Sequence, residues 1–135
     1  MSSEPSSSLS VMFKDTKAFS GFSVPDVEAA QKFYGDVLGI ETRVDNGILT
    51  LLLEGGRRPT IAYPKPGHVP ADFTILNFPV DDVGATVKEL EARGVTFERY
   101  DGMPQDDDGV MRGNGPDIAW FKDPAGNVLS VIADG

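Results

Sequence analysis

The chain has 135 residues, of which 40% are hydrophobic and 24% charged, which suits one globular domain with its own core. Its formal net charge of −9 repels phosphate backbones and anionic lipids, so we expect no nucleic acid and no membrane as partners. The absence of cysteine excludes disulfides, thiolate nucleophiles and thiolate metal sites, and it fits a cytoplasmic protein.

The N-terminal segment is polar and rich in serine. Residues 1–14 lack the charged and then apolar pattern of a signal peptide, and we expect them to be disordered. The segment 18–24 has the small and aromatic residues of a strand, and Pro25-Asp26 breaks it. Apolar residues at spacings of three and four over 27–38 then predict one helix, which Gly39 ends.

Short strands separated by turns follow this helix. They are expected at 41–44, 48–54 and 59–63, with Asp45-Asn46-Gly47 as the first turn. Residues 63–70 contain three prolines and a glycine, which makes them a linker.

The same order of elements then begins again. A strand is expected at 73–80, a helix from Val83 ending at Gly94, and strands at 95–100, 117–122 and 127–132. The polar segment 101–116 is long for a connection, and it is either a lid over a cavity or a solvated loop.

The repetition extends to the residues that start the two helices. Val24-Pro25-Asp26-Val27 recurs as Val80-Asp81-Asp82-Val83. Each half reads as strand, helix and three strands, and neither half can bury its sheet face alone. We therefore predict a single α+β domain over 15–135, built from two βαβββ modules at about 15–66 and about 71–135 that pair with each other.

Three groups of residues carry a family resemblance. They are Ser23-Val24-Pro25-Asp26-Val27 with Phe33-Tyr34 and Leu38-Gly39, then Phe78-Pro79-Val80-Asp81-Asp82-Val83 with Leu90 to Gly94, and then Trp120-Phe121-Lys122-Asp123-Pro124-Ala125-Gly126-Asn127. In this order the chain resembles the vicinal oxygen chelate superfamily, which includes glyoxalases, bleomycin resistance proteins and extradiol dioxygenases. The resemblance implies that each module curls its sheet into a half-cup and that two half-cups enclose one cavity.

The same resemblance implies where metal ligands would lie. In metal-binding members, His, Glu or Gln from the first and last strands of each module hold the ion, and these positions fall on Phe19, Ala62, Ile75 and Ser130. None of these side chains suits a divalent metal, so we expect no metal and no cofactor. His68, the only histidine, lies in the linker and is expected to be an exposed loop residue rather than a ligand or base.

Strand alternation predicts which side chains face the cup. The expected ligand-binding residues are Phe19, Ser23, Thr50, Ala62, Ile75, Asn77, Asp117, Phe121 and Ser130, with Arg112 as an anion clamp. This assignment pairs Thr50 with Ala62, and Lys122 with Asn127, which turns Trp120 toward the helices and into the core; a slip of one residue would turn Trp120 into the pocket. Ordinary sheet packing remains the alternative for each position.

The side chains expected to face the cup are mostly apolar or small, which fits a binding pocket better than a catalytic one. Asp117 is the one acid candidate, either as a buried base or as an exposed residue at a strand start, and no catalytic residue is assigned. We expect metal-independent binding of a small hydrophobic or aromatic molecule, in a homodimer of the kind that bleomycin-resistance-type relatives form. The alternatives are a metal-dependent lyase, isomerase or dioxygenase of the same superfamily, a metal-independent enzyme using Asp117 or Tyr63, and a protein-interaction module.

Overall fold

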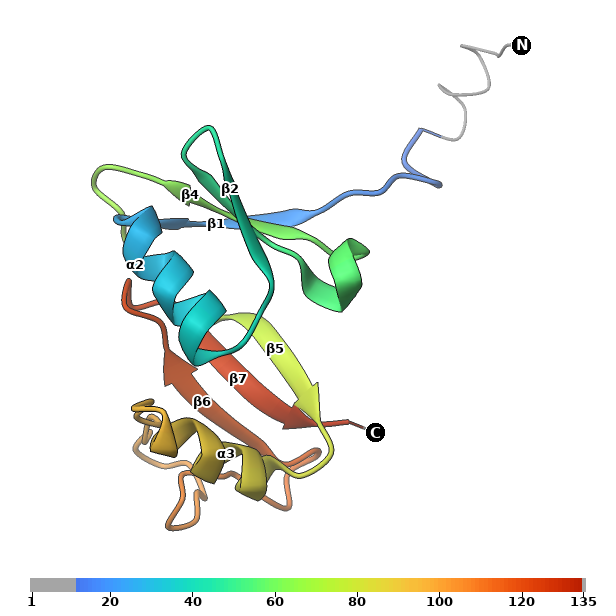
Figure 1. Ribbon diagram of the computed structural model, residues 1–135. Coiled ribbons are helices and arrows are strands. Elements are labelled where there is room, and N and C mark those ends of the chain that lie inside the picture. Colours follow the sequence, from blue (N-terminus) through green and yellow to red (C-terminus); the bar gives the residue numbers. More distant parts are fainter. Residues whose placement is uncertain (1–11, 135) are drawn as a thin grey trace.

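The computed structural model describes residues 12–134 (Figure 1). Residues 1–11, most of the segment expected to be disordered, lie outside the described residues, as does Gly135. Among residues 12–134, no helix has the length and apolar character needed to cross a membrane.

The first module forms a mixed sheet, called here the first sheet. Its strands are β1 (Ser20–Val24), β2 (Thr42–Asp45), β3 (Ile48–Leu51) and β4 (Thr60–Pro64), in the order β1-β4-β3-β2. β1 runs parallel to β4, and the other pairs are antiparallel. A short 3₁₀-helix, η2 (Leu53–Gly56), occupies the end of the strand expected over 48–54.

The first helix begins where the sequence predicts and then changes type. Asp26 caps α2 (Val27–Gln31) by accepting a hydrogen bond from the Ala29 amide at 3.1 Å. The chain continues as a π-helix, η1 (Lys32–Val37), in which the Leu38 amide donates to the Phe33 carbonyl at 3.0 Å. The wider turn contains one more residue than an α-helical turn, so an α-helical wheel misplaces the side chains that follow it.

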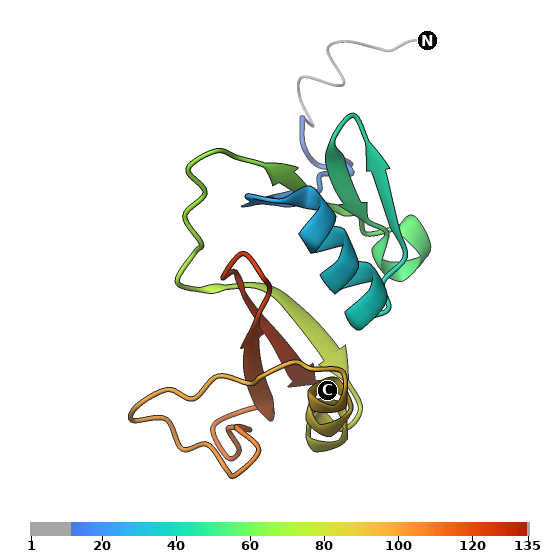
Figure 2. The same cartoon turned by 60° about the vertical axis from the view of Figure 1, so that its left-hand side comes forward.

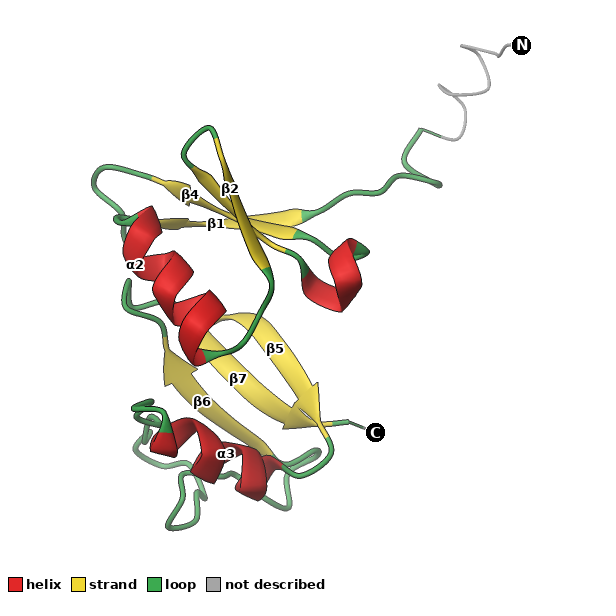
Figure 3. Ribbon diagram, in the orientation of Figure 1, coloured by secondary structure: helices red, strands yellow, loops and turns green. Residues whose placement is uncertain are grey.

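The second module repeats this order with a smaller sheet, the second sheet. It contains β5 (Thr74–Val80), α3 (Val83–Ala92), β6 (Ile118–Lys122) and β7 (Val128–Ala133), with the strands ordered β5-β7-β6. Asp82 caps α3 as Asp26 caps α2. The strand expected over 95–100 is reduced to one bridge between Phe97 and Phe121, and a long loop leads from there to β6 (Figure 3).

The two modules share one core. The first helix lies between the two sheets in both ribbon views, and α3 covers β6 and β7 (Figures 1 and 2). The Phe33 and Phe121 rings lie 6.3 Å apart across the junction. The α+β class and the two-module organisation are thus confirmed, and hydrogen bonding joins the strands into two separate open sheets.

A buried polar contact ties the modules together. The Tyr34 hydroxyl donates to Asp123 Oδ2 at 2.6 Å, and the two residues are 0% and 5% exposed. Asp123 also accepts from the amides of Ala125 and Asn127 and from the Asn127 side chain. Burial, followed by the charge of Asp123, raises the pKa of Tyr34 far above its ordinary value, so this hydroxyl remains a donor.

Candidate functional site

The first sheet has a core face and an open face. Ala62 pairs with Leu49, and both side chains are fully buried on the face that α2 covers. Thr50 pairs with Ile61, and these two lie on the opposite face with Ser23. The expected pairing of Thr50 with Ala62 is therefore wrong, and Ala62 belongs to the core.

The second sheet departs from expectation in the same way. Lys122 pairs with Val128 rather than with Asn127, which sets Trp120 opposite Ser130 and Phe121 opposite Leu129. Phe121 is fully buried in the core, which corrects its expected place in the cup. Trp120 lies on the open face, so its expected place in the core is also wrong.

Two other expected residues do lie on this open face. Asn77 pairs with Ser130 in the β5–β7 ladder, and the Ser130 hydroxyl donates to Asn77 Oδ1 at 2.6 Å. Ser130 is fully buried, so this hydrogen bond satisfies its hydroxyl.

The four positions that would hold a metal in relatives do not form a donor set. Phe19 is 62% exposed at the start of β1, and Ala62 is buried in the core. Ile75 has an aliphatic side chain, and the Ser130 hydroxyl is already bonded to Asn77. Residues 12–134 contain no group of three or more His, Asp or Glu side chains placed to hold an ion. The residues present therefore do not fit a divalent metal.

A pocket of about 340 Å³ lies at the junction of the two modules. Its walls come from β1, the linker, the start of β5 and the β6–β7 turn, and its lining residues are Gly21, Phe22, Ser23, Val69, Ala71, Phe73, Thr74, Ile75 and Asn127. It brings together two of the expected ligand-binding residues, Ser23 and Ile75. A shift in the ladder between Thr74 and Leu76 places Ile75 at an irregularity of β5.

His68 stands beside this pocket and is more constrained than a free loop residue. Its Nδ1 lies 2.7 Å from Ser23 Oγ, and its Nε2 lies 3.0 Å from the Ala125 carbonyl oxygen. The imidazole thereby joins the first strand to the turn of the last hairpin. The expectation that His68 is an exposed loop residue is wrong, because the side chain is half-buried and bonded at both nitrogens.

A second pocket, of about 330 Å³, lies on the open face of the second sheet and shares Phe73 and Thr74 with the first. Its aromatic and thioether side chains are Phe73, Tyr100, Met103 and Trp120. The Tyr100 and Trp120 rings meet edge to face with centroids 5.5 Å apart. Desolvation and the nearby Glu98 charge raise the pKa of Tyr100 above its ordinary value, so it presents a protonated hydroxyl. A sequence analysis that used the correct hairpin register would have placed Trp120 on the open face.

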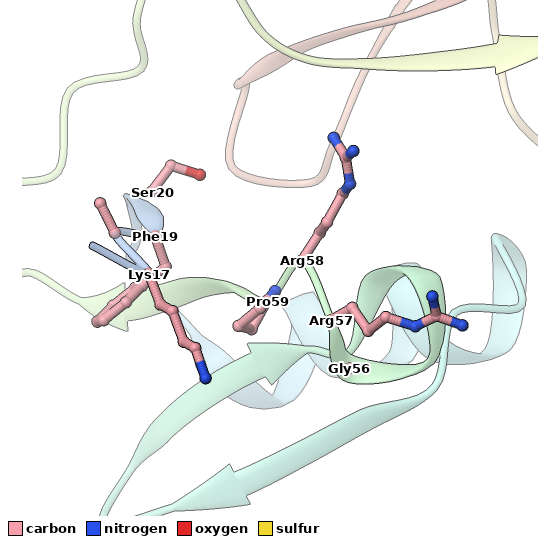
Figure 4. A pocket seen from close by; sticks show the side chains of 8 residues that line it. Lys17, Phe19, Ser20, Gly56, Arg57, Arg58 and Pro59 are labelled. Atoms are coloured by element: carbon pink, nitrogen blue, oxygen red, sulfur yellow. The ribbon is translucent and has the colours of Figure 1, made fainter. Parts of the chain in front are cut away.

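A third and larger hollow is a less suitable site. It measures about 770 Å³ and lies beside the start of β1 and η2, where Phe19 is joined by Lys17, Arg57 and Arg58. Figure 4 shows the three cationic side chains pointing away from one another. Arg58 also bonds to Glu54 at 2.7 Å. Diverging, exposed cations do not clamp one anion, which makes this hollow a poor anion site.

Asp117 and Arg112 are paired with each other, at 2.6 Å. Arg112 also contacts Asp106 at 3.0 Å, so its guanidinium bridges two carboxylates. Desolvation raises the pKa of Asp106, but the Val110 amide, Arg112 and the Asp108 amide together lower it below its ordinary value. These ion pairs connect the 101–116 loop to Asp117, the residue that precedes β6.

The model of the Glyoxalase/Bleomycin resistance protein/Dioxygenase superfamily matches residues 18–131. The chain therefore belongs to this superfamily. No curated protein matches the sequence.

Solved structures share the fold. A superfamily member from Sphaerobacter thermophilus is 26% identical, with a TM-score of 0.66 over 87% of this chain and 96% of that one. TnmS3, an antibiotic binding protein from Streptomyces sp. CB03234, is 24% identical, with a TM-score of 0.63 over 90% and 98%. The fosfomycin resistance protein FosX from Mesorhizobium loti is 11% identical, with a TM-score of 0.62 over 90% and 93%.

Proposed function

We propose that this protein binds a small apolar or aromatic molecule, without a metal, in the two joined pockets between Ser23 and Trp120. The observation that carries the proposal is the aromatic open face of the second sheet, where Trp120, Tyr100 and Phe73 line one hollow. Phe73 is 66% exposed, so its ring is accessible to a ligand in this hollow. At about 330 and about 340 Å³, the hollows lie at the lower end of the range for small-molecule sites.

The similarity to an antibiotic binding protein supports a binding role rather than a particular ligand. The donor chemistry of Phe19, Ala62, Ile75 and Ser130 does not favour the metal-dependent lyase, isomerase or dioxygenase alternative. Inductively coupled plasma mass spectrometry tests whether the protein binds a metal. The protein is purified without a metal-affinity tag, and its metal content is measured after it has been offered nickel, zinc, iron and manganese. Stoichiometric retention of any of these ions would restore the metal-dependent alternative.

The proposal includes a homodimer and a cytoplasmic location. Large apolar side chains stay exposed before β1, at the end of β4, in the linker, before β5 and in the 101–116 loop: Phe19, Tyr63, Val69, Phe73 and Met103. A second copy covering part of this surface would enclose the pockets and remove apolar area from water. Sedimentation velocity across a concentration series measures the association directly.

The binding experiment uses the fluorescent aromatic probe 8-anilinonaphthalene-1-sulfonate with EDTA present. We expect saturable enhancement of the probe's fluorescence, quenching of Trp120, and at least a tenfold weaker apparent affinity in Trp120→Ala. Val44→Ala is the matched control, because Val44 is 41% exposed and lies outside both pockets. Equal binding by the Trp120 and Val44 variants would show adsorption to any apolar patch and would refute the proposed site.

A further inference from the structure

Ser23 and His68 are placed as a reactive pair. Ser23 lies on the open face of β1 and lines the junction pocket, with its Oγ 2.7 Å from His68 Nδ1. A hydroxyl becomes a useful nucleophile when an adjacent base takes its proton, and that base works best when a third group fixes its orientation. The Ala125 carbonyl oxygen, 3.0 Å from His68 Nε2, is that third group.

The hydrogen-bond partners determine how the neutral imidazole holds its proton. The Ala125 carbonyl can only accept, so Nε2 must carry the hydrogen. Nδ1 is then the acceptor, and the Ser23 hydroxyl donates to it. The neutral side chain is therefore held in the tautomer in which its basic nitrogen receives the serine proton.

The surroundings admit a substrate. Ser23 and His68 are both half-buried rather than sealed, and the adjoining pocket holds about 340 Å³. Its walls beside Ser23 are largely apolar, with Phe22, Phe73 and Ile75 among them, and Thr74 contributes a second hydroxyl. Such walls suit an acyl group that is small and apolar.

We propose that Ser23, with His68 as its general base, accepts the acyl group of small activated esters that have an apolar acyl part. Ser23 Oγ attacks the ester carbonyl carbon while its proton passes to His68 Nδ1. The bond from that carbon to the leaving oxygen breaks, and His68 returns the proton to the departing alcohol. Water repeats the two transfers and releases the carboxylic acid and free Ser23, with no change in oxidation state.

The junction supplies little stabilisation for the oxyanion that forms in this step. The Asn127 side-chain amide lines the pocket, but it is bonded to the Ser23 carbonyl at 3.1 Å and to Asp123 Oδ2 at 3.0 Å. Preorganised donors at an oxyanion are commonly the largest catalytic contribution, so turnover here is slow. The experiment therefore detects the covalent step rather than steady-state hydrolysis.

The full chain is incubated with an alkyl fluorophosphonate, and the modified residue is located by tandem mass spectrometry. We expect one adduct per chain, on Ser23, and none there in Ser23→Ala. His68→Gln should label at least about 100-fold more slowly, since a general base contributes about 10²- to 10⁴-fold. Ser20→Ala is the matched control, because Ser20 lies on the same strand but bonds to Thr60 Oγ1 at 2.8 Å rather than to an imidazole.

Absence of an adduct at Ser23, equally fast labelling of Ser20, or an unchanged rate in His68→Gln would each overturn the proposal. Thermal unfolding of every variant establishes that it folds. If His68→Gln does not fold, the pH profile of the wild-type labelling rate decides: a rate that rises with pH to a plateau supports the base, and a flat profile refutes it. Labelling at Ser23 is measured independently of dye binding at Trp120. If the proposed binding function fails, the labelling experiment still tests the reactivity of Ser23.

Discussion

Replacing Tyr34 by Phe removes one hydroxyl from the contact that joins the two modules. The Tyr34 side chain is fully buried, and its hydroxyl donates to Asp123 Oδ2 at 2.6 Å. The ring also meets Phe22 and Phe33, with centroids 5.7 and 5.2 Å away, and phenylalanine preserves those contacts. The substitution therefore isolates the hydrogen bond from the packing.

The expected loss of stability depends on the charge of the acceptor, Asp123. A hydrogen bond to a charged group contributes about 1.5–3 kcal/mol, and Asp123 is only 5% exposed, so water replaces the lost donor poorly. For a domain of this size, roughly 4 °C of melting temperature accompanies each kcal/mol. We expect the free energy of unfolding to fall by about 1.5–3 kcal/mol and the melting temperature by about 6–12 °C.

Urea unfolding followed by Trp120 fluorescence and far-ultraviolet circular dichroism measures this change. Tyr63→Phe is the control, since Tyr63 is 39% exposed and makes no side-chain hydrogen bond among residues 12–134. Its effect should stay within about 0.5 kcal/mol. Equal losses in the two variants would show that the Tyr34 hydroxyl does not stabilise the junction, and the reasoning would fail.

Three other outcomes are expected. Because the pKa of Tyr34 lies above its ordinary value of 10.0, the unfolded chain releases the Tyr34 proton at a lower pH than the folded protein does. The free energy of unfolding should therefore fall as pH rises above about 10, and it should fall less steeply in Tyr34→Phe. Urea unfolding midpoints at several pH values measure this difference. The depressed pKa of Asp106 should give its carboxyl carbon a titration midpoint below 3.8 by nuclear magnetic resonance, and Arg112→Ala should raise that midpoint; an unmoved midpoint would contradict the pairing. Gly126→Ala should destabilise more than Gly67→Ala in thermal unfolding, because both have positive φ but only at Gly126 does a new Cβ come within 3.2 Å of a linker proline.

Much of the fold follows from local sequence signals. Asn46 and Gly47 adopt φ values of 52° and 78°, as the predicted tight turn between two strands requires. Asp26 and Asp82 cap the two helices through the same three-residue spacing. These features depend on interactions between near neighbours, so the sequence predicts them without knowledge of the tertiary structure.

The candidate site was harder to predict because it depends on register. The Asp123 carboxylate accepts from the amide of Asn127, which extends the turn by one residue and shifts the β6–β7 pairing. A one-residue shift exchanges the two faces of a strand, so Trp120 and Phe121 exchange places between pocket and core. Nothing in the local pattern distinguishes the two pairings, since both strands are apolar apart from Lys122 and Ser130.

His68 was missed for another reason. Its partners are 45 and 57 residues away in the chain, and it lies in a segment whose composition predicts only a linker. Only the approach of the last hairpin to the first strand brings Ser23, His68 and Ala125 together. Side-chain chemistry that forms across a module junction leaves no periodic signal in the sequence.

The Tyr34–Asp123 contact has a consequence for how the chain is made. Its two residues are separated by 89 positions, and Asp123 belongs to the β6–β7 hairpin, which leaves the ribosome well after the first module. A nascent first module must therefore carry a Tyr34 hydroxyl without its Asp123 partner, and an uncovered helix face, until the β6–β7 hairpin has been made. Closure of so long a loop also delays the final packing step, so a chain stalled before residue 123 should be a target for chaperones and proteases.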